Sequence, residues 1–156
     1  MMKKISNEQL VANRKEISVF RYLSEEDLER ISGYFKIKEV AANNIIWKEW
    51  DPCEYLAFIL SGSVKMKKET EFKGKEIVFG LYKKGATIGA LCVLDRGIRP
   101  VTAVTLEDVS LLLVTREDFD ELLENHPKSG SKLLKGMLFS LSSRLRGSFD
   151  RMTSIF

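Results

Sequence analysis

The sequence predicts a mainly β protein with flanking helices, because short β-prone runs with glycine turns fill its middle and helical spacings fill both ends. The chain has 156 residues, of which 44% are hydrophobic and 30% are charged. This length suits one domain over residues 1–156. We expect an N-terminal helical lead-in over 1–35, strands over 36–114 and C-terminal helices over 115–156.

The clearest helix start in the lead-in is Ser24. Three acidic residues follow it directly, where the dipole of a helix favours negative charge, and serine is a preferred N-cap. Apolar side chains then recur at helical spacing at Leu28, Ile31 and Phe35. The pattern predicts a helix that begins after Ser24.

The middle of the chain alternates between short β-prone runs and turns. Ser61-Gly62-Ser63 and Lys73-Gly74 are turn signals. Many short strands at regular spacing favour a barrel, a roll or a sandwich. Trp47 and Trp50 could each belong to the core or to the surface. The expected strands cover residues 45–47, 55–60, 64–68, 75–82, 101–105 and 109–114.

Two helices are expected after the strands. Thr115 is a suitable cap for the first, and Pro127 stands where the second would begin. The second helix carries an apolar seam with steps of three and four residues, which is typical of a coiled coil. We expect this seam to form a homodimer, although it could instead pack on the strands of its own chain. The seam consists of Leu134, Leu138, Leu141, Leu145, Ser148 and Met152.

Gly136 and Gly147 interrupt the same helix, where glycine is unfavourable by about 1 kcal/mol relative to alanine. We expect them to mark a close approach of a ligand, a strand or a second helix.

Composition excludes several classes of protein. The net charge of +3 does not by itself indicate nucleic acid. No apolar run approaches the roughly 20 residues that cross a bilayer, and the start of the chain lacks the apolar run of a signal peptide. We therefore expect a cytoplasmic protein without a membrane partner.

The sequence offers few residues that could form a catalytic or metal-binding site. His126 is the single histidine, and no nucleophile–histidine or carboxylate pair can be assembled, so we expect no enzyme. Cys53 and Cys92 are too few for a zinc site, and we expect two reduced thiols. Cys92 could sense oxidants if a nearby cation lowered its pKa, but a small apolar filler is the favoured interpretation.

The segment from Gly89 to Arg99 carries the most chemistry. A glycine precedes a short apolar stretch, Ala90 to Leu94, which can form one or two helical turns. Backbone N–H groups at such a start converge on one point and can bind an anion. An arginine across that point can add a bidentate hydrogen bond. The segment therefore predicts a site for a small anionic ligand.

Several motifs in order resemble the cyclic-nucleotide-binding domain family. Residues 49–64 (EWDPCEYLAFILSGSV) are similar to its E-G-D-x-x-[DE]-x-x-[YF]-x-[IV]-x-x-G-x-V run. Gly85-x-x-x-Gly89 resembles the entry to its phosphate-binding cassette, and we call residues 85–104 the cassette. Phe20–Leu28 and Thr115–Phe119 resemble its flanking helices. The match covers about Phe20 to Arg151 and looks closest to the sensor half of catabolite-activator-type and fumarate-nitrate-type regulators.

The resemblance implies a double-stranded, jelly-roll-like β-roll with N-terminal helices and a long C-terminal helix that closes over the ligand and forms a dimer. The family cassette reads roughly G-E-[LI]-[AG]-L…P-R-[ST]-A, which makes Gly89 the glycine and Arg99 the phosphate-binding arginine. Ala90 stands at the ribose-binding glutamate and Pro100 at the hydroxyl position. Trp50 replaces the glycine of the E-G-D turn.

These departures weaken binding of cAMP or cGMP. A lost charge-assisted hydrogen bond to a ribose hydroxyl removes about 1.5–3 kcal/mol, or roughly 10- to 150-fold in affinity. We expect no certain cofactor, with a cyclic nucleotide weakened by Ala90 and Pro100 and another nucleotide or acidic metabolite as the alternative ligand.

The sequence therefore predicts a stand-alone ligand-sensing module that signals through its last helix. The expected ligand contacts are Gly89, Ala90, Leu91, Arg99, Pro100, Val101 and, from the last helix, Ser148. Two alternatives stay open: a cassette that binds no nucleotide, in a scaffold for dimerisation or a partner protein, and the sensor half of a transcription regulator. The resembled regulators carry a helix-turn-helix domain after the long helix, and the sequence ends soon after it, which weighs against direct DNA binding.

Overall fold

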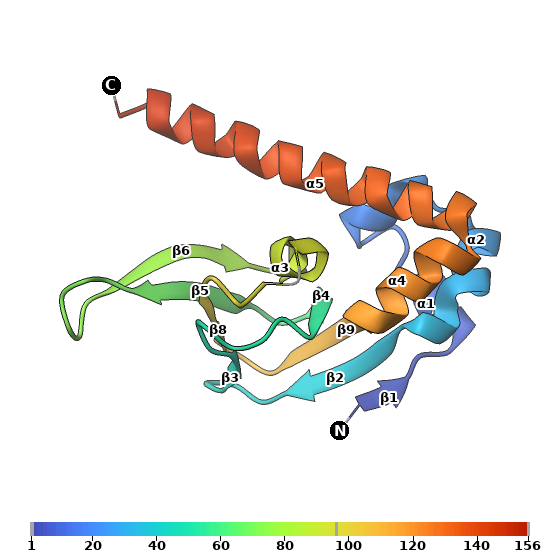
Figure 1. Cartoon of the computed structure of the whole chain (residues 1–156), viewed down its shortest axis with the longest axis horizontal. Coiled ribbons are helices and arrows are strands. Elements are labelled where there is room, and N and C mark those ends of the chain that lie inside the picture. Colours follow the sequence, from blue (N-terminus) through green and yellow to red (C-terminus); the bar gives the residue numbers. More distant parts are fainter. Residues whose placement is uncertain (1, 96, 156) are drawn as a thin grey trace.

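The computed structural model describes residues 2–95 and 97–155 (Figure 1). The strands are β1 (Met2–Lys4), β2 (Lys36–Val40), β3 (Ile45–Trp47), β4 (Tyr55–Ser61), β5 (Val64–Glu69), β6 (Glu76–Tyr82), β7 (Thr87–Ile88), β8 (Thr102–Thr105) and β9 (Val109–Thr115). The helices are α1 (Asn7–Ala12), α2 (Glu25–Ile31), α3 (Ala90–Asp95), α4 (Arg116–Asn125) and α5 (Pro127–Thr153), with 3-10 turns η1 (Ser18–Tyr22) and η2 (Ser32–Tyr34).

The strands form two antiparallel sheets. One has the order β1-β2-β9-β4-β7 and the other the order β3-β8-β5-β6. Strands β4 and β9 are buried on both faces, because helices cover one side of their sheet and the second sheet covers the other. Leu56 and Phe58 accordingly point into the helical core, whereas Ala57 and Ile59 point into the core between the sheets. The predicted β-roll with flanking helices is confirmed.

The predicted helix starts are also present. The Ser24 hydroxyl accepts a hydrogen bond from the Asp27 backbone N–H, and the Asp27 carboxylate accepts one from the Ser24 N–H, which completes a capping box. Thr115 caps α4 through the Asp118 N–H. Pro127 opens α5, where a missing N–H is harmless.

The long helix α5 lies across η1 at Gly136. A β-carbon at Gly136 would overlap the Val19 carbonyl oxygen, so only glycine permits this approach. Gly147, by contrast, has open space around it. Beyond η1, α5 runs along one side of the β-roll, and its C-terminal end projects away from the helices (Figure 1).

Two features differ from the expected elements, and a third settles an alternative that the sequence left open. The lead-in is not wholly helical, because β1 pairs with β2 at one edge of the larger sheet. Strand β2 itself carries three charged residues, which hid it in the sequence. Trp47 is buried in the core, whereas Trp50 is 69% exposed and has a positive φ of 76° in the place of the expected glycine.

None of the helices in the described part of the chain has the length and apolar character to cross a membrane.

Candidate functional site

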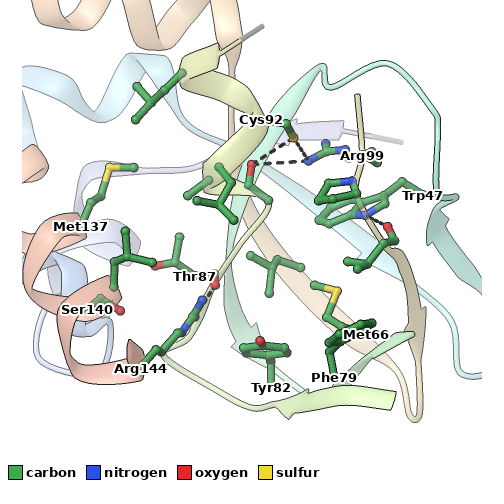
Figure 2. Close-up of a pocket in the computed structure, with 18 of the residues that line it drawn as sticks. Trp47, Met66, Phe79, Tyr82, Thr87, Cys92, Arg99, Met137, Ser140 and Arg144 are labelled. Atoms are coloured by element: carbon green, nitrogen blue, oxygen red, sulfur yellow. Dashed lines mark hydrogen bonds between the residues drawn. The ribbon is translucent and has the colours of Figure 1, made fainter. Parts of the chain in front are cut away.

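A cavity of about 580 Å³ lies between the β-roll, the cassette and α5 (Figure 2). Its wall is mostly apolar, and its volume falls in the range of ordinary small-molecule sites. The cassette, which includes β7, forms one side of the cavity, β6 forms the floor, and α5 forms the opposite side. The lining residues are Trp47, Met66, Phe79, Tyr82, Thr87, Ile88, Gly89, Ala90, Leu91, Cys92, Leu94, Arg99, Pro100, Val101, Leu134, Met137, Leu138, Ser140, Leu141 and Arg144.

Gly89 is the point at which the cassette turns from β7 into α3. Its φ is +77°, which glycine adopts without strain. A β-carbon there would lie 2.5 Å from Nη1 of Arg99 and 3.0 Å from the Trp47 ring. Gly89 therefore allows the arginine to pack directly against the backbone of the turn.

Arg99 is 1% exposed and is held by the protein on several sides. Its Nη2 donates a 2.6 Å hydrogen bond to the Tyr55 carbonyl oxygen. Its guanidinium carbon lies 3.8 Å from the centroid of the Trp47 ring, which is a cation–π contact. Its Nε has no hydrogen-bond partner. Burial lowers the pKa of Arg99, although Tyr55 and two nearby carboxylates oppose the shift.

Cys53 and Cys92 form a disulfide, which corrects the expectation of two separate reduced thiols. They lie 39 residues apart in sequence, and their Cα atoms are 5.8 Å apart. The bond joins the turn before β4 to the middle of α3. Cys92 Sγ also lies 3.4 Å from Nη1 of Arg99, so the disulfide, the arginine and the glycine turn form one packed unit.

A second arginine enters the cavity from α5. Arg144 donates a short hydrogen bond from Nη2 to the Thr87 carbonyl oxygen, and its guanidinium lies 4.8 Å from the centroid of the Tyr82 ring. Burial lowers the pKa of Arg144, with a smaller opposing effect from Tyr82. Figure 2 shows Arg144 and Arg99 on opposite sides of the cavity.

Six of the seven predicted ligand contacts line this cavity: Gly89, Ala90, Leu91, Arg99, Pro100 and Val101. Ser148 does not, because it lies one turn beyond Arg144 and its hydroxyl donates to the Arg144 carbonyl oxygen. Arg144 lines the cavity but is not among the contacts predicted from the sequence. The signal was available in the spacing, since Met137, Leu141 and Arg144 lie on one helical face.

The charge in the wall has one sign. Arg99 and Arg144 are its charged side chains among the residues that the structure describes, and neither forms an ion pair there. Within residues 2–95 and 97–155 no group of three or more His, Cys, Asp or Glu side chains could hold a metal ion. The described wall of the cavity therefore combines apolar side chains with two cationic ones.

Comparisons with known proteins agree with this architecture. The model of the cyclic nucleotide-binding domain family matches residues 37–126. The cyclic AMP receptor protein of Thermus thermophilus is 29% identical over 109 residues, which cover 70% of this chain and 50% of that protein. The global nitrogen regulator of Synechocystis is 29% identical over 141 residues, covering 89% and 58%. This chain thus spans about half the length of the curated relatives it matches.

Solved structures extend the likeness to the whole fold. A cyclic nucleotide-binding domain from Methylobacillus flagellatus superposes with a TM-score of 0.83 and 27% sequence identity, over 96% of this chain and 84% of that one. The family model covers more than half of the residues here, including the cassette and the strands that surround it. This chain belongs to the cyclic nucleotide-binding domain family.

Proposed function

We propose that this chain is a cytoplasmic, non-catalytic regulatory module that senses a small anionic ligand in the cavity between the cassette and α5. The main support is the sign of the charge in the wall: two half-buried or buried arginines border an apolar cavity whose described lining holds no carboxylate. The carboxylates of Asp51 and Glu54, which act on Arg99, lie outside that lining. A buried cation without a counter-ion is unfavourable. An anionic ligand would supply the missing charge.

The proposed ligand contacts follow the cassette. Gly89, Ala90 and Leu91 offer backbone groups, Arg99 offers charge, and Pro100 and Val101 form the adjoining wall. Ser148 could contribute only where α5 of a second copy approaches the cavity. Ala90 has no carboxylate for a ribose hydroxyl and Pro100 has no hydroxyl or N–H, so we infer that cAMP and cGMP bind weakly.

Signalling would pass through α5. A ligand in this cavity contacts the cassette and α5 at once, so it favours the helix position in which both contacts are made. The seam residues Leu138, Leu141 and Leu145 are exposed along α5. Leu138 and Leu141 also line the cavity. We infer that two copies pack along this seam in a homodimer, so that a ligand beside these two leucines would change the geometry of the dimer.

One observation favours a scaffold as the second candidate function. Nη2 of Arg99 is already satisfied by the Tyr55 carbonyl, and the guanidinium stacks on Trp47, so the arginine already has a structural role. In that case the exposed seam would bind a partner protein without any ligand. The relatives named as a cyclic AMP receptor and a nitrogen regulator support a third arrangement, in which this chain is the sensor half of a transcription regulator.

A thermal-shift panel separates sensor from scaffold. Cyclic nucleotides, linear nucleotides and acidic metabolites would be tested on the wild type, on Arg99→Met and on Arg99→Lys. A sensor shows a rise in melting temperature with at least one anion, and the rise is lost in Arg99→Met and partly kept in Arg99→Lys, which retains charge without the planar guanidinium. No shift with any anion would reject the sensor in favour of the scaffold.

A further inference from the structure

We propose that the ligand is an amphipathic organic anion, whose carboxylate or phosphate head group is bound by Arg144 on α5 and whose apolar body fills the cavity. This inference rests on the proposed function and names the ligand class and the residue that selects it. Arg144 lies outside the cassette and outside the motifs that carried the family resemblance.

The guanidinium of Arg144 has N–H donors without a hydrogen-bond acceptor among the described residues. A guanidinium carries five N–H donors, and that of Arg144 uses Nη2 on the Thr87 carbonyl oxygen and makes no other hydrogen bond or ion pair with the described residues. Its other neighbour is the face of the Tyr82 ring, which attracts the cation without consuming a donor. The remaining N–H groups border a cavity whose described wall has no acidic side chain.

Thr87 places a second polar group beside this arginine. The residue is 5% exposed, and its hydroxyl has no hydrogen-bond partner. Thr87 lines the cavity and is joined to Arg144 through its carbonyl oxygen, as Figure 2 shows. A buried hydroxyl without a partner is unfavourable by about 1–3 kcal/mol. A head group on Arg144 could accept a hydrogen bond from it and remove that cost.

The rest of the wall suits a body without hydroxyl groups. Leu134, Met137, Leu138 and Leu141 line the cavity from α5, while Leu91 and Leu94 line it from α3. A ribose in these surroundings would have to bury its hydroxyls without partners, because Ala90 stands where a carboxylate would bind them. An aliphatic or aromatic body loses no hydrogen bonds there and gains hydrophobic burial.

Calorimetry with chemically matched probes would test the proposal. Decanoate and decyl phosphate, below their micellar concentrations, carry the two head groups, and 1-decanol is the neutral counterpart. Inorganic phosphate and cAMP represent anions without an apolar body. We expect decanoate or decyl phosphate to bind with one molecule per chain and a negative heat-capacity change, and to bind tenfold or more tightly than 1-decanol and inorganic phosphate.

Two variants assign the head group. Arg144→Gln should weaken binding of the anionic probe by about 10- to 100-fold and leave 1-decanol unchanged. Arg146→Gln, an exposed arginine two residues along α5, should match the wild type. Thermal unfolding of each variant checks that it folds. If Arg144→Gln proves unstable, Arg144→Lys provides a second test, because it keeps the positive charge and should retain part of the affinity for the anionic probe.

The outcomes distinguish the two proposals. Equal affinity for 1-decanol and decanoate, or equal loss in Arg144→Gln and Arg146→Gln, would overturn the role of Arg144. Tight binding of cAMP without binding of the decyl probes would reject the amphipathic class and keep the anion sensor. Absence of binding by every anion, in these probes and in the wider thermal-shift panel, would reject both.

Discussion

The Asp27 carboxylate accepts a 2.7 Å hydrogen bond from the ammonium of Lys132, across 105 residues of sequence. Its second oxygen accepts a 2.8 Å hydrogen bond from the Ser129 hydroxyl. The same carboxylate caps α2 through Ser24. Burial alone would raise the pKa of Asp27, but the hydrogen bonds from Lys132, Ser24 and Ser129 outweigh burial and hold the pKa well below its usual range.

Asp27 should therefore stabilise the fold in a pH-dependent way. Asp27→Asn should lower the free energy of unfolding at pH 7 by about 2 kcal/mol, less than for a fully buried pair because the Lys132 side chain is 43% exposed. A carboxyl with a lowered folded-state pKa stabilises above the unfolded value of about 3.9 and loses this effect as the pH falls toward the folded value. The difference between wild type and variant should be constant from pH 7 to about 5 and should narrow below about 4.

Urea unfolding at several pH values measures this difference. Glu26→Gln is a matched control, because the Glu26 side chain is 80% exposed and its ion pair with Arg30 is worth little. A gap between Asp27→Asn and wild type that persists unchanged at pH 3 would contradict the prediction.

Two of the glycines of α5, Gly136 and Gly147, should respond in opposite directions to alanine. Gly136→Ala should destabilise by about 1–3 kcal/mol, because its β-carbon overlaps the Val19 carbonyl oxygen and η1 must move. Gly147→Ala meets open space and should stabilise by about 0.5–1 kcal/mol through helix propensity. Thermal unfolding of the two variants side by side tests the pair, and a gain in stability at both positions would show that α5 does not approach η1 as described.

The disulfide should contribute measurably to stability. Reduction, or replacement of both Cys53 and Cys92 by alanine, should lower the free energy of unfolding by about 2–4 kcal/mol. Thiol titration of the unfolded chain should find no free thiol without reductant and two after reduction. Two free thiols in protein purified without reductant would show that the bond does not form in solution.

The exposed seam on α5 should set the oligomeric state. Leu145 is 54% exposed, lies outside the cavity wall and should be buried in the proposed dimer. Leu145→Glu should shift the mass measured by light scattering from dimer to monomer, because two carboxylates would face each other in an apolar interface. Ser143→Glu, on an exposed position of the same turn, should leave the dimer intact. A wild type that is already monomeric at high concentration would contradict the proposal.

Much of the fold could be predicted because local rules and tertiary structure agree. Ser24, Thr115 and Pro127 start helices where capping chemistry places them, and the strands around Gly62 and Gly74 follow their turns. Strands β1 and β2 were not among the individual strands predicted, because charged residues make up most of both and leave no strong apolar alternation.

The site was harder to predict than the fold. Arg99 and Gly89 could be placed from the cassette pattern, since the residues that define it are close in sequence. The Cys53–Cys92 bond depends on how distant segments meet, and spacing along the chain carries no information about it. Helical spacing places Arg144 on the face of Met137 and Leu141, but it does not show that this face meets β7. Both became apparent only once α3 and α5 were placed against the β-roll.

The contact at Gly136 has a mechanical consequence. It fixes the first part of α5 against η1 and leaves the helix from Gly136 to Thr153 as an arm about 25 Å long. A tilt of α5 by about 10° around the Gly136 contact would displace its C-terminal end by about 4 Å. The residues of α5 beside the cassette are nearer to Gly136 and would move by a fraction of that distance. In the proposed sensor, a small adjustment of α5 around a ligand would therefore produce a larger displacement at the C-terminal end of the helix, and the position of Gly136 would set the ratio of the two movements.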